Sequence, residues 1–510
     1  MSDSTRVPKV SVVVPAYNSG PHLENLIASL LRQSLPVEEF EVVFVDDGST
    51  DTTPARLDEL AAAHPHIRVL HIDNSGWPSR PRNIGVAHAR GEYVFFSDDD
   101  DWFGDEALER LYDVAAANDA DIVVGKMAGH NRSVPRELFR RNRFDATLAN
   151  SPLIDSLTAH KLFRRSFLNE HEIRFPEGPR RLEDHSMVVR ALLLSKRTCV
   201  LADYVCYHHI RRGDAGNLTA QTLNAAGYYA NLREVLDIVD AHVEPGPLRD
   251  RLHRRWLRNE MVSRLRGKRL LNAPEDWIAE VVSECGKIIR ERFAPGVAAG
   301  LPPLQRTITT LTAQDRLADL RRLAEWEAGV RVRATVDEHQ LTGSVLTVRI
   351  TAQLESGDEP VTLAVSDGRY GLVLPVDDVD PDVLDVTDRV SKARLDIVLR
   401  RKEGGEEFFL PVEQHAEQEP VASAGPGRVH LVHHATATVD FATLNEGRTE
   451  GAWMIKARLT ESGWTEDARV PLTFRCAADG AVPTRVPPAA KKKPRARARL
   501  RRALKRLLGR

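Results

Sequence analysis

Residues 93–102 read YVFFSDDDDW, so that an entirely apolar run is followed at once by four consecutive carboxylates. A short apolar run such as Tyr93–Phe96 is typical of a parallel strand buried on both faces. Similar runs at 10–14 and 42–45 also end in polar residues, and apolar residues recur at helical spacing from Leu23 to Leu31. The alternation predicts an α/β fold with a mostly parallel sheet. Ligands of such sheets bind at the carboxyl ends of the strands, so we expect the polar clusters to form one site.

The carboxylates of Asp98–Asp101 would repel one another unless a cation neutralises them. Hard oxygen ligands of this kind favour Mg²⁺ or Mn²⁺, and a diphosphate would complete the coordination shell. The alternative is a solvated acidic turn that caps the following helix, because Asp is favoured at helix N-caps.

The spacing of apolar residues changes twice along the remainder of the chain. Arg- and Leu-rich helical patterns extend to about residue 330, and residues 330–336 then alternate strictly, as do later runs at 346–352, 394–400, 428–432 and 452–459. The pattern leaves open whether these strands form one sandwich or two. The expected divisions are an α/β domain over 1–225, a helical domain over 226–330, an all-β sandwich-like module over 331–478, and a Pro-rich linker with a basic tail over 479–510.

Composition places the chain among globular proteins of several domains, with 510 residues, 42% hydrophobic and 28% charged. The four cysteines are far apart and form no C-x-x-C pair, which favours free thiols in a reducing cytoplasm. The sequence has no run of 18 apolar residues, and its first residues have no apolar signal region. We therefore expect neither a membrane span nor secretion.

Residues 491–510 hold eleven of the 71 lysines and arginines and no acidic residue, which leaves the other 490 residues with a net charge of −13. Leucines at 500, 504, 507 and 508 share one helical face. This pattern predicts a basic amphipathic helix on an anionic membrane surface. The alternatives are a disordered tail and a segment that attracts a polyanionic acceptor. The tail has no aromatic residue to stack on bases, so nucleic acid is not an expected partner.

Four segments in this order, VSVVVPAYN, FVDDGSTD, RPRNIGVAHARGEYVFFSDDDDW and RRLEDHSMVVRALL, resemble the inverting family 2 glycosyltransferases with the GT-A fold. The resemblance covers roughly residues 8–220, and within the family the chain is similar to enzymes that glycosylate wall teichoic acid. It implies transfer of a sugar from a UDP-sugar to a hydroxyl of a cell-surface glycan or polyol-phosphate acceptor. Asp47, Ser49 and Asp51 are better explained by turn and cap chemistry.

The resemblance also implies a nucleotide-sugar site. Pro15 and Tyr17 would contact the base, Asp46 would accept from the uracil imide, and Asp98 would contact the ribose. The further residues expected to bind the nucleotide-sugar are Asn18, Arg82, Asn83, Asp99, Arg211 and Arg212.

A D-x-D metal motif is implied at Asp98 and Asp100, with Mn²⁺ or Mg²⁺ as cofactor and His209 as a further ligand. The middle position, Asp99, departs from the usual pattern and leaves the register within the acidic run open.

Asp184 matches the family's catalytic base, which takes the proton of the acceptor hydroxyl, and Glu183 would position it. An N-terminal capping pair for the following helix is the structural alternative, and both roles are compatible.

Two other functions remain to be separated from this one. A sugar nucleotidyltransferase would need a Gly-rich phosphate loop after the first strand, which is missing here. A catalytically dead scaffold that only binds nucleotide-sugar or carbohydrate would have no need of the acidic run and of Glu183–Asp184. We expect the β module to bind acceptor or to form a homo-oligomer, and the enzyme to lie in the cytoplasm at the inner face of the plasma membrane.

Overall fold

The computed structural model describes residues 7–132, 134–210, 224–402, 407–444, 449–477 and 483–486. The chain divides into two compact units. The first comprises Met1–Arg264 and Pro274–Gly300, and the second comprises Leu265–Ala273 and Leu301–Arg510. The division falls inside the predicted helical domain, so the boundaries at 225 and 330 stay predictions.

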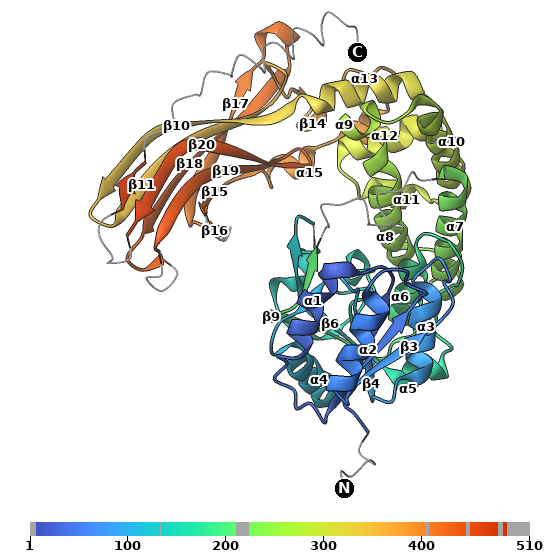
Figure 1. Ribbon diagram of the computed structural model, residues 1–510. Coiled ribbons are helices and arrows are strands. Elements are labelled where there is room, and N and C mark those ends of the chain that lie inside the picture. The colour runs from blue at the N-terminus through green and yellow to red at the C-terminus, as the bar shows by residue number, and fades with distance from the viewer. Residues whose placement is uncertain are drawn as a thin grey trace, which may run out of the picture. The chain divides into compact units, whose positions relative to one another are not determined.

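The first unit is built on the predicted α/β sheet (Figure 1). Its strand order is β3 (Ile67–His71), β2 (Phe40–Asp46), β1 (Val10–Ala16), β4 (Tyr93–Phe96), β8 (Leu162–Arg164), β6 (Ile122–His130), β9 (Thr198–Ile210) and β5 (Trp102–Phe103), with β7 (Arg143–Ala146) on β9. Strands β3, β2, β1 and β4 are parallel, whereas β8 pairs antiparallel with both β4 and β6. Every residue of β2 and β4 is buried, as expected for central strands covered on both faces.

Helices connect these strands: α1 (Leu23–Leu30), which lies where the apolar spacing predicts a helix, α2 (Thr53–Ala63), α3 (Ser79–His88), α4 (Ala107–Ala117), α5 (Arg165–Glu170) and α6 (Glu183–Leu194). Helix α3 lies directly on β1, where Gly85 leaves no room for a side chain beside Val13. The α/β prediction is therefore confirmed.

Further helices complete the first unit: α7 (Ala225–His242), α8 (Pro247–Trp256), η5 (Leu257–Met261), η6 (Val262–Arg264), α10 (Glu275–Arg292) and α11 (Pro295–Ala299). Two of them contact α6: α7 packs on it, and the Trp256 indole of α8 donates to His185 Nδ1 at 3.3 Å. Burial and the neighbouring Arg255 lower the pKa of His185 to about 3, so this imidazole is neutral and can accept the bond.

The second unit begins with three helices, α9 (Gly267–Leu271), α12 (Pro303–Ala313) and α13 (Leu317–Ala328), and continues into two antiparallel sheets. The larger contains β10 (Val330–Thr342), β11 (Val345–Ser356), β18 (Arg428–Asp440), β13 (Leu363–Ser366), β14 (Arg369–Leu372), β12 (Glu359–Pro360) and β17 (Val412–Pro420). The smaller contains β16 (Glu407–Phe409), β15 (Arg394–Arg401), β19 (Gly451–Glu461), β20 (Trp464–Cys476) and β21 (Thr484–Arg485). Two short helices, α14 (Pro381–Leu384) and α15 (Thr387–Val390), interrupt the strands.

The two sheets form one sandwich, which answers the question that the sequence pattern left open. Alternate residues such as Val348 and Ile350 of β11 are buried against the facing sheet. A buried hydrogen bond joins the layers, because His433 Nε2 on β18 lies 2.9 Å from Glu461 Oε2 on β19. The expected all-β module is therefore confirmed as a two-layer structure (Figure 1).

Within the described ranges, no helix is long and apolar enough to cross a bilayer. The four cysteines, Cys199, Cys206, Cys285 and Cys476, are buried and free, as predicted. Arg211, Arg212 and the basic tail over 491–510 lie outside the described residues.

Candidate active site

The carboxyl ends of β1, β2 and β4 meet, as the parallel pattern predicts. The turn after β1 is fastened to the turn after β2, because Asn18 donates its amide to Ser49 Oγ at 2.9 Å and accepts from the Thr50 amide at 2.8 Å. Asn18 has a positive φ of 48°, a conformation that asparagine tolerates better than most residues. Ser19 donates to Asp99 Oδ2 after β4, so the three polar clusters form one site.

Asp46, expected to accept from a uracil, is buried at the end of β2 and bonded on both carboxylate oxygens. It accepts from the Ser49 amide at 3.1 Å and from His71 Nδ1 at 2.9 Å. Since His71 Nε2 also donates to Asp58, both carboxylates favour the imidazolium and raise the pKa of His71. Tyr17, by contrast, is 50% exposed and leaves a ring face open beside this site.

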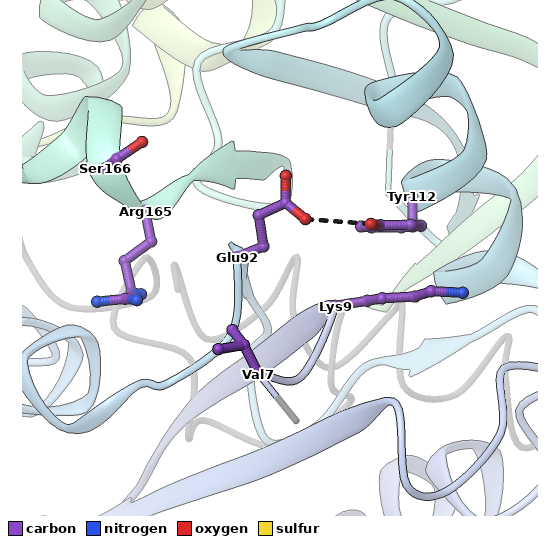
Figure 2. A pocket seen from close by; sticks show the side chains of 6 residues that line it. All are labelled: Val7, Lys9, Glu92, Tyr112, Arg165 and Ser166. Atoms are coloured by element: carbon purple, nitrogen blue, oxygen red, sulfur yellow. Dashed lines mark hydrogen bonds between the residues drawn. The ribbon is translucent and has the colours of Figure 1, made fainter. Parts of the chain in front are cut away.

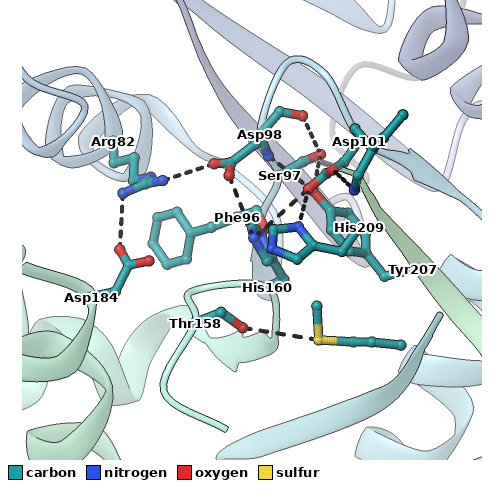
Figure 3. A network of polar contacts seen from close by, with 12 residues as sticks. Arg82, Phe96, Ser97, Asp98, Asp101, Thr158, His160, Asp184, Tyr207 and His209 are labelled. Carbon is teal, nitrogen blue, oxygen red and sulfur yellow. Dashed lines mark hydrogen bonds and ion pairs between the residues drawn. The ribbon is translucent and has the colours of Figure 1, made fainter. Parts of the chain in front are cut away.

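Arg82 connects Asp98 to Asp184 in the polar network of Figure 3. It projects from α3, is 4% exposed, and donates from Nη2 to Asp98 Oδ1 at 2.8 Å and from Nη1 to Asp184 Oδ1 at 3.0 Å. The guanidinium also lies over the Phe175 ring, 5.1 Å from its centroid. One buried cation therefore joins the aspartate expected at the donor to the aspartate expected to act as base.

The electrostatics of this network favour charged groups despite burial. Burial alone would lower the pKa of Arg82, but the facing Asp184 and Asp98 raise it above its ordinary value. Burial likewise opposes ionisation of Asp98, while His160 and Arg82 hold the pKa of that carboxyl well below its usual range. Asp98 is thus an anion in the folded protein, as a ligand for a hydroxyl or a cation must be.

Asp101 lies between two groups of potential metal ligands. Ligand atoms of Asp98, Asp100 and Asp101 lie within 4.8 Å of one another, and the same holds for Asp101, His160 and His209. Asp101 is completely buried and accepts from His209 Nδ1 and from the Ile210 amide, each at 2.8 Å. The Nε2 atom of His209 is buried and has no hydrogen-bond partner among the described residues, which fits a nitrogen reserved for a cation.

The tautomer of His160 also indicates a cation site. Its Nδ1 must donate to the Phe96 carbonyl at 3.2 Å, because a carbonyl can only accept. Its Nε2 faces carboxylate oxygens of Asp98 at 3.5 Å and Asp101 at 3.9 Å (Figure 3). Burial lowers the pKa of His160, while the charges of Asp98 and Asp101 oppose this shift. In its neutral form the ring turns a lone pair toward these two carboxylates. A divalent cation between these groups would remove that conflict, so the carboxylates and imidazoles present fit a metal site.

Glu183 and Asp184 begin α6, directly after Leu182, whose φ of 64° is unusual for a bulky residue. Such strain concentrates at functional sites, where surrounding contacts hold it in place. Burial and the neighbouring Asp184 charge raise the pKa of Glu183 to about 7. Asp184 is more accessible, with 24% of its side chain exposed. The pair thus combines a shielded carboxyl with one that can reach a substrate.

Other predicted residues have mainly structural contacts. Asn83 donates to the Phe175 carbonyl at 2.9 Å and accepts from the Phe175 amide at 3.0 Å, so it anchors this segment beneath Arg82. Pro15 lies within β1, next to the base-binding candidates. The structural contacts leave the assigned nucleotide roles of both residues as predictions.

Sequence analysis missed His160 and Asp101 as site residues, and it missed Lys161. His160 stands alone in its segment without a spacing signal, and only the antiparallel pairing of β8 with β4 brings it to the end of β4. Lys161 is completely buried, which lowers its pKa to about 7, and its ammonium donates to the Thr158 carbonyl at 2.6 Å. Asp101 was within the quoted acidic run, but its buried orientation depends on β9.

A pocket at the opposite end of the sheet is unrelated to this site. Figure 2 shows that Lys9, Glu92, Tyr112 and Arg165 line it, together with Val7 and Ser166. Lys9 and Glu92 immediately precede β1 and β4, and Tyr112 donates to Glu92 Oε2 at 3.1 Å. Because ligands of parallel sheets bind beyond the carboxyl ends of the strands, this pocket is not the expected donor site.

Two family models match segments of the chain. Residues 11–175 match the family described as Glycosyl transferase family 2, and residues 225–324 match that described as Glycosyl transferase TarS linker domain. A poly(ribitol-phosphate) beta-glucosyltransferase of Bacillus spizizenii is 34% identical over 235 residues, which are 46% of this chain and 37% of the relative. The poly(ribitol-phosphate) beta-N-acetylglucosaminyltransferase TarP of Staphylococcus aureus is 31% identical over 232 residues, which are 44% of this chain and 71% of TarP.

Solved structures show the same fold. The crystal structure of S. aureus TarS 1–349 in complex with UDP-GlcNAc has a TM-score of 0.56 and 25% identity, over 69% of this chain and 98% of that one. The crystal structure of S. aureus TarS extends the similarity to 94% of this chain and 85% of TarS, with a TM-score of 0.54 and 20% identity. In sequence, however, the chain spans only 37% of the B. spizizenii relative and 52% of TarS.

Proposed function

Since the chain belongs to glycosyltransferase family 2, we propose that it transfers a hexose or N-acetylhexosamine from a UDP-sugar to a hydroxyl of a polyol-phosphate polymer, with inversion at the anomeric carbon. The observation that carries the proposal is Arg82, which joins Asp98 to Asp184 inside one buried network. The base takes the proton of an acceptor hydroxyl that attacks the anomeric carbon of the bound donor, so the base and a donor-binding carboxylate must lie close together, as they do in this network. The names of both relatives specify a beta product, and UDP-hexoses carry an alpha-linked sugar, which supports inversion.

In this proposal the nucleotide lies across the ends of β1 and β2. Asp46 and the exposed ring of Tyr17 receive the base, while Asp98 accepts from the ribose. Asp99, Asn18 and Asn83 shape the surrounding turns, and the two arginines at 211 and 212 are proposed from the family resemblance alone to bind the diphosphate. Arg82 keeps Asp98 ionised and oriented for the donor.

Asp98, Asp100, Asp101, His160 and His209 would hold the divalent cation. When bound, the cation stabilises the charge that develops on the leaving UDP. Asp184 takes the proton of the attacking hydroxyl, and its bond to Arg82 Nη1 orients the carboxylate. Glu183 acts as a positioning residue behind it, because it is more deeply buried.

For the acceptor, we propose that the β module binds the polymer or a second copy of the chain. The basic residues 491–510 would hold the enzyme at an anionic membrane surface, on the cytoplasmic side where UDP-sugars are made. Both proposals come from the sequence pattern and from the relatives.

The test is a screen of UDP-sugars with purified protein, Mn²⁺ and poly(ribitol phosphate), with release of UDP as the readout. We expect one or two donors to support turnover, EDTA to abolish it, and NMR of the product to show a beta linkage. Tight UDP binding without turnover of any donor would favour a dead scaffold. Pyrophosphate release from UTP and a sugar phosphate would favour a nucleotidyltransferase.

A further inference from the structure

A second group of metal-ligating side chains lies far along the chain from the acidic site, on the larger sheet of the β module. His415 and Glu417 of β17 and His434 of β18 place their ligand atoms within 4.8 Å of one another. His415 and His434 are direct cross-strand partners, and Glu417 is two residues beyond His415 on the same face of the strand. The two imidazoles stack with centroids 4.9 Å apart, and His415 Nε2 lies 3.5 Å from Glu417 Oε1.

The hydrogen bonds of His434 determine which of its nitrogens is available. Thr351 Oγ1 on β11 donates its single hydrogen to Asp337 Oδ2 at 2.7 Å. The same oxygen lies 2.9 Å from His434 Nδ1, so it must accept a hydrogen from that nitrogen. The neutral His434 ring therefore carries its lone pair on Nε2. A carboxylate–hydroxyl–imidazole chain of this kind is the usual support behind a metal-binding histidine, because it fixes the tautomer and raises the basicity of the ligand.

A cation that joins β17 to β18 would stabilise an exposed strand. Eight of the nine residues of β17 are exposed, so the strand buries almost no side chain. Among the described residues it pairs with β18 alone, which leaves it at the edge of the sheet. A cation held by His415 and Glu417 on one strand and His434 on the other would fix the edge strand and its register.

We propose that His415, Glu417 and His434 bind one transition-metal cation of the Zn²⁺ class on the outer face of the β module. Two imidazoles and one carboxylate suit Zn²⁺, whereas Mg²⁺ and Mn²⁺ prefer oxygen ligands. Tetrahedral coordination at normal Zn²⁺ bond lengths requires ligand atoms about 3.3 Å apart, so the side chains must converge slightly. His415 and Glu417 have 66% and 59% of their side chains exposed, which leaves their rotamers free to do so.

The experiment measures bound zinc on the untagged full chain after removal of metals with EDTA. Equilibrium dialysis against Zn²⁺ in excess Mg²⁺, followed by metal analysis, gives the number of equivalents bound. His415→Ala and His434→Ala should each bind one equivalent fewer than the unmodified chain. His339→Ala, which removes a histidine of β10 outside the group, should bind the same number as the unmodified chain.

One further variant tests the support of His434. Thr351→Val keeps all three ligands but removes the support of His434, and it should weaken zinc binding about 10–100-fold. Zinc at the acidic site is common to all variants and cancels in the comparison. Equal zinc content in the unmodified chain and in folded His415→Ala, checked by circular dichroism, would overturn the proposal.

Discussion

Arg82 shows how a single buried side chain can connect two functions of a site. Arg82→Lys keeps a positive charge but cannot bond both Asp98 and Asp184 with a planar fork. We expect kcat/KM for the donor to fall at least about 100-fold, because a misplaced base and a misplaced donor each cost turnover. The matched control is Arg80→Lys on the exposed face of the same helix, which should leave kinetics unchanged. Arg82→Lys kinetics equal to those of Arg80→Lys would show that the bridge has no catalytic importance.

Asp184→Asn tests the base itself. The amide can still accept from Arg82, so the network and UDP binding should persist while the proton acceptor is lost. Turnover should fall about 10²–10⁴-fold, as expected for removal of a general base. Steady-state kinetics together with calorimetric titration of UDP measure the two effects separately. A variant with nearly unchanged turnover would exclude Asp184 as the base.

Glu183 predicts a pH-dependent stability. Burial and Asp184 raise its pKa from 4.5 to about 7. Between these two pH values, Glu183 is therefore protonated in the folded chain but ionised in the unfolded chain. The free energy of unfolding therefore falls as pH rises from 4.5 to 7. Glu183→Gln removes this titration. The free energy of unfolding of the variant should therefore increase relative to that of the unmodified chain across this window, by roughly 2 kcal/mol at pH 8. Denaturant unfolding in EDTA at pH 5 and pH 8 measures it; a constant difference between the two proteins would contradict the assigned shift.

At the scale of elements, α3 positions Arg82 only because Gly85 allows it to lie against β1. A Cβ at Gly85 would clash with the Val13 side chain. Gly85→Ala should therefore destabilise the fold by about 1–3 kcal/mol through overpacking, although alanine is the better helix former. Gly227→Ala, in α7, meets only ordinary contact with Asn224 Oδ1 at 3.5 Å and should be neutral or stabilising. Thermal unfolding of both variants measures the effect. A Gly85→Ala variant as stable as the unmodified chain would show that the contact between α3 and β1 does not require glycine.

Many of the strands could be predicted from the sequence, because their apolar residues follow a clear pattern. Short runs composed mainly of apolar residues predicted β1, β2 and β4, and strict alternation predicted β10 and β11. The parallel pattern also predicted that their polar ends would meet. It could not predict His160, because an antiparallel strand inserted beside β4 brings this residue to the site from 64 residues beyond Phe96.

The function of individual acidic residues was also beyond the local pattern. Four adjacent aspartates are equivalent in sequence, yet Asp99 faces Ser19, Asp98 faces Arg82, and Asp101 faces His209. Their division depends on which elements surround the turn. Likewise, only contacts between the two sheets, such as that between His433 of β18 and Glu461 of β19, show that they form one sandwich.

At the scale of the whole molecule, the charge is distributed unevenly: residues 491–510 carry eleven cations, while the remainder is acidic. Each Lys or Arg near an anionic membrane contributes about 1 kcal/mol, and an apolar helix face adds to this. We therefore expect the full chain to sediment with vesicles rich in phosphatidylglycerol at low salt, and the chain without residues 489–510 to remain in the supernatant.

A further variant separates membrane insertion from simple charge attraction. Replacing Leu500, Leu504, Leu507 and Leu508 by alanine preserves all eleven cations and removes the apolar face. If the tail lies on the membrane as an amphipathic helix, this variant should lose most of its vesicle binding in 0.15 M salt, where charge attraction is screened. It should still bind poly(ribitol phosphate) at low salt as the unmodified chain does. Equal vesicle binding by both proteins at 0.15 M salt would show that the leucines are not membrane anchors. Failure of the full chain to sediment even at low salt would leave the anionic polymer as the partner of the tail.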